Sequence, residues 1–292
     1  GSELSPDQAR FRTDLDAIGK ILDASTRAVR GNGDCAFGIA AHSLRAVPVD
    51  KLTSLMTHRD RFNIRPVHIH IAEQSREVDD CVATHGKRPV ELLLDIAPVD
   101  RDWTLVHATH LNESEIKGVA GSGAIVAICP TTEANLGDGI FPLPQFLTLN
   151  GKIAIGSDSH VCVSPWEELR WLEYVQRLVT QSRNVIATNQ RPHTGTSLLT
   201  LLAKTAARTT GRPTGRLEPG ARADLIVLED LPQFSGRNAA QILDTAIFAS
   251  NANPVRHVMV GGRWRIRDGH HAQEKRITQD YQRVVQKLLE GM

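Results

Sequence analysis

PVHIHIAEQ, residues 66–74, is the stretch that decides the fold of this chain. A short apolar run ends abruptly at three residues, Ala72-Glu73-Gln74, two of them polar, as a buried strand does where it enters a loop. Short continuous apolar runs are typical of parallel strands that are buried on both faces of a sheet. The same form recurs in four other segments: Cys35–Ala41, Trp103–Val106, Ala124–Cys129 and Lys152–Gly156.

The spacing of these five segments predicts the architecture. Their ends, at residues 41, 71, 106, 129 and 156, are separated by 30, 35, 23 and 27 residues. Helix start signals fall between and after them, at Asn112 with Glu115 and at Ser164 with Pro165 and Glu167. A (β/α)₈ barrel of about 250 residues uses roughly 30 residues for each unit. The sequence therefore predicts an α/β fold, a partial TIM barrel whose five units are equivalent to strands 4–8.

The segment before Cys35 predicts only one helix, over Pro6–Val29. A closed barrel needs eight strands, and open edges of a buried parallel sheet leave backbone groups unpaired. We therefore expect three further units to precede these residues in a complete barrel.

A second, smaller domain is predicted after the barrel units. Residues 215–224, GRLEPGARAD, lead into the apolar run Leu225–Leu228, and a Gly261-Gly262 turn joins two further runs, Val255–Val260 and Arg263–Arg267. A helix is predicted near the end of the chain, over Thr278–Leu289. We expect domains at residues 3–212 (barrel units) and 213–292 (part of a β-sandwich with a terminal helix).

The composition excludes several classes of function. A formal net charge of +1, with 41% apolar and 23% charged residues, provides no basic surface for nucleic acid or a membrane. No apolar run approaches the roughly 20 residues needed to span a bilayer. Four widely separated cysteines with no CxxC pair make a disulfide framework improbable, so a cytoplasmic location is the expectation. We expect the four cysteines to be small buried hydrophobic residues without disulfides: Cys35, Cys81, Cys129 and Cys162.

Four residues at the predicted strand ends could carry metal-dependent chemistry. His70 and Glu73 form an H-x-x-E motif, His107 follows the third strand, and Asp158 follows the fifth. Imidazoles and carboxylates are suitable ligands for Zn²⁺, and a carboxylate that is not a ligand can move protons during metal-assisted hydrolysis. Each residue alone is weak evidence, since a histidine at a strand end is often structural. Together, at successive strand ends, they predict one site.

The same residues carry a resemblance to a known family. The H-x-x-E motif, His107 and the Gly156-Ser157-Asp158 strand end resemble the deaminase branch of the amidohydrolase superfamily. More narrowly, the chain is similar to the formimidoylglutamate deiminase family over residues 34–290. The stretches that carry this resemblance are HSLRAV (42–47), HIHIAEQ (68–74), LVHATHL (105–111), CPTTEANLGDG (129–139), IGSDSH (155–160), SPWEELRWLEY (164–174) and NPVRHVMVGGRW (253–264).

The resemblance implies a role for each residue at the metal. His70 and Asp158 would be ligands of a single Zn²⁺, although Fe²⁺ or Mn²⁺ would also suit these ligand types. Glu73 would shuttle the proton, His107 would polarise the water or the developing charge, and Asp158 would also help to deprotonate the water. The first-strand H-x-H pair of the family is not among these residues. His68 precedes His70 in the chain's own H-x-H, and we expect it to point away from His70 and to serve packing.

The resemblance also implies a reaction and a substrate. The reaction would be hydrolysis of the formimino C=N bond of N-formimino-L-glutamate, which gives N-formyl-L-glutamate and ammonia. His42 and Arg45 would bind this small anionic substrate, because a guanidinium pairs bidentately with a carboxylate. A homodimer is the expected assembly.

Two alternatives stay open. The chain could be a different deaminase of the superfamily, acting on guanine or a related heterocycle; Arg45 and the aromatic content of 4% disfavour this interpretation. It could also be a catalytically incomplete fragment or an assembly subunit, in which the barrel units are kept for packing.

Overall fold

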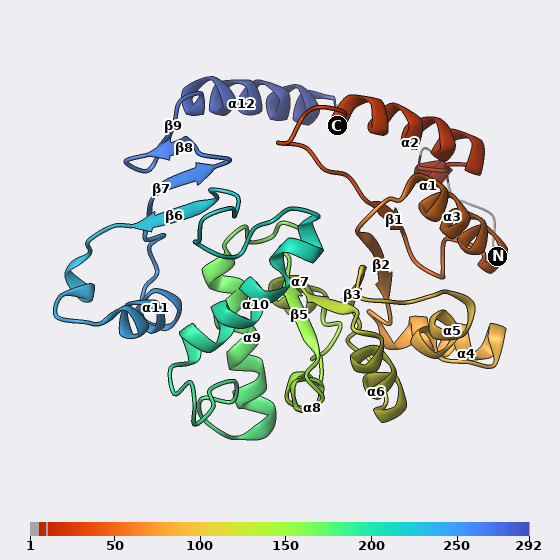
Figure 1. Ribbon diagram of the computed structural model, residues 1–292, viewed down its shortest axis with the longest axis horizontal. Helices are drawn as coiled ribbons and strands as arrows, with labels where there is room; N and C mark the ends of the chain where they lie inside the picture. Colours follow the sequence, from red (N-terminus) through yellow and green to blue (C-terminus); the bar gives the residue numbers. More distant parts are fainter. Residues whose placement is uncertain (1–5, 10, 292) are drawn as a thin grey trace. The chain divides into compact units, whose positions relative to one another are not determined.

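The computed structural model describes residues 6–9 and 11–291 of the chain (Figure 1). Contacts between residues divide the chain into two compact units, Gly1–Pro213 and Thr214–Met292. Each unit is described by itself.

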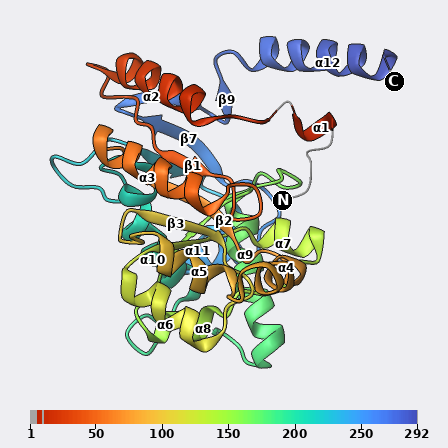
Figure 2. The same ribbon diagram turned by 90° about the vertical axis from the view of Figure 1, so that its right-hand side faces the viewer.

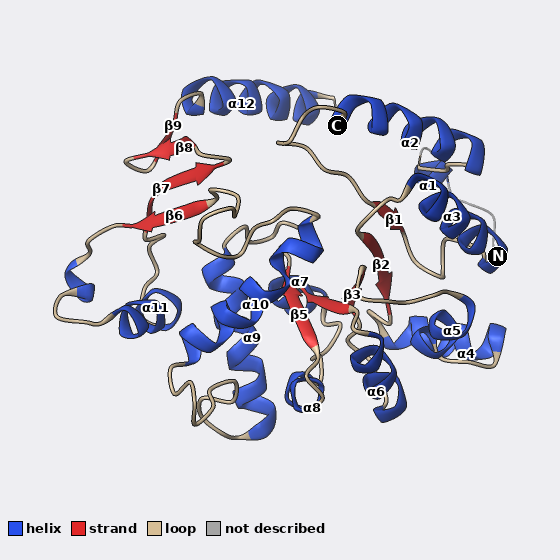
Figure 3. Cartoon of the chain, viewed as in Figure 1, coloured by secondary structure: helices blue, strands red, loops and turns tan. Residues whose placement is uncertain are grey.

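The first unit is built on a five-stranded parallel sheet. Its strands are β1 (Ile39–Ala41), β2 (Val67–Ile71), β3 (Trp103–His107), β4 (Ile125–Ile128) and β5 (Lys152–Ile155). They are paired in the order of the sequence, and every neighbouring pair is parallel (Figure 3). The five predicted strands and the α/β class are confirmed, and the strand order is that of consecutive barrel units.

Helices connect the strands of this sheet. Asn112 caps one of them with a capping box, and the Ser164 hydroxyl accepts a hydrogen bond from the Glu167 N–H at another, so both predicted start signals are confirmed. In Figure 2, α2 (Leu15–Val29) lies beside α3 (Val49–Phe62), and the two helices pack against each other. The helices are α1 (Pro6–Ala9), α2 (Leu15–Val29), α3 (Val49–Phe62), α4 (Ser75–His85), α5 (Pro89–Ile96), α6 (Glu113–Ser122), α7 (Pro130–Leu136), α8 (Leu143–Thr148), α9 (Pro165–Thr180) and α10 (Thr194–Thr210).

The single helix predicted over Pro6–Val29 is wrong, because the segment forms α1 and α2 with a break between them. Asp14 lies in an extended conformation at this break, and its carboxylate accepts a hydrogen bond from the Ala17 N–H at 2.7 Å. A short side chain that caps a helix in this way satisfies a backbone donor at the start of the helix. The cap therefore starts a new helix instead of continuing the first.

The core of the sheet is deepest at β4, the neighbour of the edge strand β5. All four residues of β4 are buried, and its Ile125 and Ala127 pack with Ala154 of β5. The prediction that all five strands are buried on both faces is wrong for β1 and β2, where burial alternates. On β2 the less buried face carries the polar side chains of His68 and His70. On β4 the corresponding face carries apolar core side chains.

The second unit contains a four-stranded antiparallel sheet. The order of its strands is β6 (Leu225–Leu228), β7 (Val255–Val260), β8 (Arg263–Arg267) and β9 (His270–His271). The predicted hairpin is confirmed, because Gly261 and Gly262 both adopt positive φ between β7 and β8. A short 3₁₀ helix, η1 (Pro232–Phe234), and α11 (Ala239–Phe248) follow β6, and α12 (Glu274–Glu290) follows β9.

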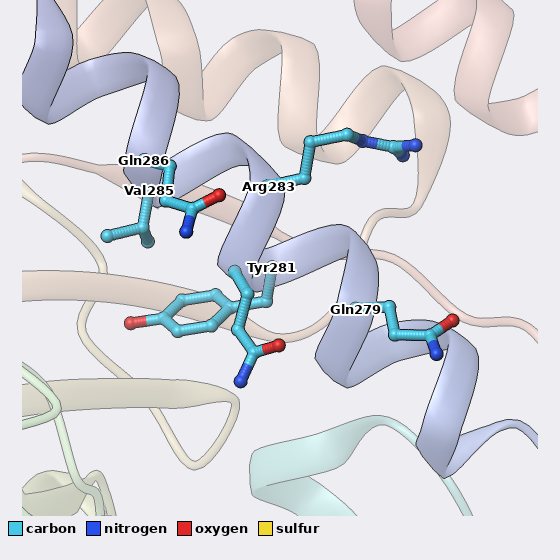
Figure 4. Close-up of a pocket in the computed structure, with 6 residues that line it drawn as sticks. Gln279, Tyr281, Arg283, Val285 and Gln286 are labelled. Atoms are coloured by element: carbon cyan, nitrogen blue, oxygen red, sulfur yellow. The ribbon is translucent and has the colours of Figure 1, made fainter.

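A surface depression on α12 brings no separate elements together. It is lined by residues of this helix alone, including Gln279, Tyr281 and Arg283 (Figure 4). The Arg283 guanidinium is already paired with Asp280 of the same helix at 2.6 Å. The depression is therefore part of a solvated helix surface.

The cysteines are less buried than the sequence suggests. Only Cys129, at the end of β4, is buried, while Cys35 is exposed and Cys81 and Cys162 are partly exposed. The prediction of four buried cysteines is therefore wrong for three, because Cys35 and Cys162 lie in loops and Cys81 lies at a partly exposed position of α4. All four thiols are free. Among the described helices, none is both long and apolar enough to cross a bilayer.

Candidate metal and catalytic site

The carboxyl ends of β2, β3 and β5 bring the predicted site residues together. His70 lies on β2, His107 ends β3 in register with Ile71, and Asp158 lies three residues beyond the end of β5. Ligand atoms of His70, His107 and Asp158 all lie within 4.8 Å of one another. Because the strands are parallel, their carboxyl ends meet at one edge of the sheet, which is where barrel enzymes place their chemistry.

Glu73 belongs to the same cluster. Its Oε1 lies 3.7 Å from His107 Nε2, and Asp158 Oδ2 lies 4.0 Å from the same nitrogen. The two carboxylates therefore face one imidazole nitrogen from different strands. The structure brings all four sequence-predicted residues to one point.

The orientation of His70 suits a metal ligand. Its Nδ1 lies 2.9 Å from the carbonyl oxygen of His42, and its backbone N–H donates to the same carbonyl at 3.0 Å. An imidazole that donates from Nδ1 keeps the lone pair of Nε2 for a metal, and such a hydrogen bond orients the ring. His70 is therefore preset to coordinate through Nε2.

His107 lies in a buried and highly acidic environment. Its side chain is 1% exposed, and Nδ1 lies 3.2 Å from Oε1 of the buried Glu133. Burial lowers the pKa of His107, but the hydrogen bond and charge of Glu133, with the charges of Glu73 and Asp158, outweigh burial and leave this pKa above its ordinary value. Acidic neighbours on two sides thus favour a protonated ring.

Two of the cluster residues have unusual backbone conformations. The φ angles are +68° at His107 and +39° at Asp158. Residues other than glycine rarely adopt this left-handed region, and such strain concentrates at functional sites, where the surrounding structure holds it. Both strained residues direct their side chains toward the common point.

The donor set fits a divalent metal such as Zn²⁺. Catalytic zinc sites commonly use three protein ligands from histidine and carboxylate, with a further position left for water. Two imidazole nitrogens and one carboxylate oxygen provide three such ligands within the described residues. A neutral His107 can complete this ligand set, whereas a protonated His107 can only donate a hydrogen bond, which is the polarising role that the resemblance implies.

Arg45 and His42 lie at the rim of this cluster. Arg45 Nη2 lies 3.1 Å from Glu73 Oε2, and its Nε lies 3.9 Å from Glu77 Oε2, while its side chain is 40% exposed. The His42 ring lies 5.4 Å from the His70 ring, centroid to centroid. Burial, followed by electrostatic repulsion from His70 and Arg45, lowers the pKa of His42. Both predicted substrate residues therefore lie beside the cluster, and Arg45 is already paired with a carboxylate.

His68 does not face away from His70 as expected. Residues two apart on a strand share a face, and both histidines lie on the less buried face of β2. Distance along the strand separates His68 from the cluster instead, and its Nε2 lies 3.2 Å from the carbonyl oxygen of Thr209 in α10. His68 is a structural residue for that reason.

The structure adds acidic residues that the sequence analysis did not single out. Glu133 contacts His107, Glu77 Oε2 accepts the Glu73 N–H at 2.9 Å, and Asp138 Oδ1 accepts a hydrogen bond from Gln74 at 3.1 Å. Glu133 could have been found, because β4 was the one predicted strand followed by a polar segment to which no role was given. Glu77 gives no such signal, since it lies beyond the strand-end segment Ala72-Glu73-Gln74 to which a role had already been given.

A parallel α/β sheet with histidines, a glutamate and an aspartate gathered at its carboxyl edge defines the class of metal-dependent barrel hydrolases. Residues 1–265 match the model of the amidohydrolase family, and the chain belongs to this family.

Individual relatives agree with this assignment. The chain is 42% identical over 293 residues to formimidoylglutamate deiminase of Pseudomonas aeruginosa, an alignment that covers 99% of this chain and 64% of the relative. The crystal structure of an amidohydrolase from Brucella melitensis superposes with a TM-score of 0.92 at 38% identity, covering 99% of this chain and 63% of that one. A zinc-bound adenosine deaminase from Xanthomonas campestris shares the fold, with a TM-score of 0.78 at 23% identity, covering 89% and 58%. The chain thus spans slightly less than two thirds of these relatives.

Proposed function

We propose that this protein hydrolyses the formimino C=N bond of N-formimino-L-glutamate and releases N-formyl-L-glutamate and ammonia. The observation that carries the proposal is the convergence of His70, His107 and Asp158 within 4.8 Å, with Glu73 beside them. The 42% identity to a formimidoylglutamate deiminase supports the choice of substrate.

In this mechanism His70 and Asp158 would hold the metal, and His107 lies beside them. A bound Zn²⁺ would supply Lewis acidity and would lower the pKa of water toward about 7. Glu73 takes one proton of the attacking water, and Asp158 takes the second from the hydroxyl that forms on the carbon, since both carboxylates face the same point. Both protons pass through Glu73 to the imino nitrogen, which leaves as ammonia as its bond to the carbon breaks and the C=O bond forms.

His107 stabilises the charge that develops as water adds to the substrate. Its Nε2 faces the cluster, and its acidic surroundings favour the protonated ring that donates a hydrogen bond. A hydrogen-bond donor aimed at developing charge in a buried site lowers the barrier because it needs no reorganisation.

Arg45 is the proposed partner of the substrate carboxylate. It is the cation that ion-pairs with Glu73, and two fifths of its side chain is open to solvent. In the bound state its guanidinium would exchange part of its pairing with Glu73 for pairing with the substrate, which leaves Glu73 free to move protons.

The ion pair between Arg45 and Glu73 also favours a second candidate function. A guanidinium already neutralised by Glu73 and close to Glu77 suits a neutral substrate, such as guanine or a related heterocycle. Ammonia release from N-formimino-L-glutamate and from guanine, measured side by side on the metal-loaded protein, distinguishes the candidates. Turnover of guanine alone would overturn the first proposal.

The Glu73→Gln variant tests the proton shuttle. An amide cannot accept the proton, so we expect loss of ammonia release of at least about 100-fold, the scale of general acid–base catalysis, with unchanged zinc content. Glu113→Gln is the matched control, because Glu113 is an exposed helix carboxylate paired with Lys117. Full activity of Glu73→Gln would refute the role of Glu73.

A further inference from the structure

Glu133 lies directly behind the candidate site and has no role in the mechanism given above. We infer that Glu133 is a positioning residue that holds the His107 ring with its proton on Nδ1, so that Nε2 faces Glu73 and Asp158. The effect on turnover rests on the proposed function, whereas the effect on the ring does not.

The geometry of the Glu133 carboxylate supports this assignment. Its Oε1 lies 3.2 Å from His107 Nδ1 and also accepts the Cys129 N–H at 2.9 Å. An ionised carboxylate can only accept hydrogen bonds. The ring nitrogen that faces Glu133 therefore carries a proton in both forms of the ring. In the protonated ring Nε2 donates toward Glu73 and Asp158, and in the neutral ring Nε2 keeps its lone pair.

The anchor of the carboxylate is rigid. Cys129 follows β4, whose Ile128 is paired in register with Ile155 of β5. The Glu133 N–H donates back to the Cys129 carbonyl at 2.9 Å, so the first turn of α7 holds the carboxylate over the strand end. The end of β4 thus sets the ring orientation of a residue on β3.

His107 needs such an anchor more than an ordinary buried histidine does. Its backbone has φ of +68°, and Nε2 has carboxylate oxygens at 3.7 and 4.0 Å, which are too long for strong hydrogen bonds. The bond to Glu133 is the shortest of its carboxylate contacts. Hydrogen-bond partners of this kind orient site histidines, and their removal typically costs 10–100-fold in activity.

A cavity that Glu133 helps to line makes the inference testable by chemical rescue. It measures about 250 Å³ and is mostly apolar, with lining residues that include Ile128, Ala134, Phe141 and Leu172 besides Glu133. Truncation of Glu133 would extend this cavity to the His107 ring. A small carboxylate such as formate could then enter and take the place of the lost group.

The first experiment measures the ring directly in the full chain. In ¹⁵N-histidine NMR spectra recorded at alkaline pH, where the ring is neutral, we expect His107 to be protonated on Nδ1. We expect Glu133→Ala to shift His107 toward the Nε2-protonated form or a mixture, and added formate to restore the original signals. An unchanged His107 tautomer in Glu133→Ala would overturn the inference.

Matched controls separate positioning from a general loss of packing. Glu168 is also buried beside α7 and accepts hydrogen bonds from the Thr131 N–H and hydroxyl at 3.0 and 2.5 Å, but its carboxylate does not contact His107 in the described structure. Glu168→Ala should leave the His107 signals in place, and an equal shift in this variant would overturn the inference. If Glu133→Ala fails to fold by circular dichroism, Glu133→Gln is measured instead. Its amide oxygen can still accept from Nδ1, so the tautomer should be retained, and a lost tautomer preference would overturn the assignment.

The second experiment measures turnover of the metal-loaded protein. We expect Glu133→Ala to lower kcat by 10–100-fold with a smaller change in KM, and formate to restore part of kcat. Altered NMR signals without turnover of any imine substrate by the unmodified protein would refute the proposed function and leave the positioning role intact. Altered signals with unchanged kcat would overturn the catalytic part of the inference.

Discussion

At the scale of single residues, the Glu73 carboxylate is shared between two partners. Arg45 lies on one of its oxygens at 3.1 Å, and His107 Nε2 lies 3.7 Å from the other. A general base is most effective when it is held within reach of its proton but is not tied up by a stronger partner. The exposed position of Arg45 makes this pairing exchangeable when an anionic substrate arrives.

Arg45→Met tests the substrate contact. A charged hydrogen bond contributes about 1.5–3 kcal/mol, so we expect KM for N-formimino-L-glutamate to rise by roughly 10–100-fold, while the zinc content stays constant. Steady-state kinetics of ammonia release provide the measurement. Arg76→Met is the control, because Arg76 is an exposed arginine of α4 that pairs with Asp80 at 3.7 Å. An unchanged KM would remove Arg45 from the binding site.

At the scale of elements, the helix caps were readable because their chemistry is local. The Asn112 side chain accepts the Glu115 N–H at 2.9 Å, and the Glu115 side chain accepts the Asn112 N–H at 2.9 Å. Asn112→Ala removes one half of this reciprocal cap, and we expect a loss of about 1 kcal/mol in the free energy of unfolding. Urea denaturation measures it. Lys117→Ala, at an exposed position of the same helix outside the cap, should lose clearly less.

His68 makes one element-scale contact sensitive to pH. Burial lowers the pKa of His68, which the hydrogen bond to the Thr209 carbonyl partly offsets. Below its ordinary value of 6.5 the unfolded chain therefore takes up a proton before the folded chain does. Above pH 6.5 the imidazole of His68 is neutral in both states and does not reduce the free energy of unfolding. As the pH falls below 6.5, protonation of His68 in the unfolded chain reduces this free energy.

When the pH is lowered from 7.5 to 5.5, we expect the free energy of unfolding to fall less for His68→Gln than for the unmodified chain. Urea unfolding at the two pH values gives the comparison, and the other histidines contribute equally to both proteins. An identical pH dependence in the two proteins would show that His68 is not buried against α10 in solution.

At the scale of the whole molecule, a bound metal would link three strands of the sheet. The possible ligands come from β2, from β3 and from the loop after β5, so an unfolded chain offers no such site. A ligand that binds only the folded state stabilises it by about 2.7 kcal/mol at 100 times its Kd. We expect saturating Zn²⁺ to raise the Tm by roughly 5–10 °C, given a shift of about 2–4 °C per kcal/mol for 150–250 residues.

Asp158→Ala is the control for this stabilisation. It removes a ligand from the partly exposed end of the site, so the Tm without metal should change little, while the shift caused by Zn²⁺ should disappear. Differential scanning fluorimetry measures the Tm. If Zn²⁺ raised the Tm of Asp158→Ala as much as that of the unmodified protein, the metal would bind elsewhere.

The sequence by itself determined the parallel α/β unit, its five strands and the four residues His70, Glu73, His107 and Asp158. These features depend on local patterns: apolar runs of strand length, caps at helix starts, and polar residues at strand ends that parallel pairing must bring to one edge. Only the tertiary structure decided which partners complete the site. Three side-chain contacts complete the site and its surroundings, and they join residues 26, 28 and 141 positions apart: His107 with Glu133, Arg45 with Glu73, and His68 with Thr209. Contacts at such separations depend on the packing of whole elements and leave no local pattern in the chain.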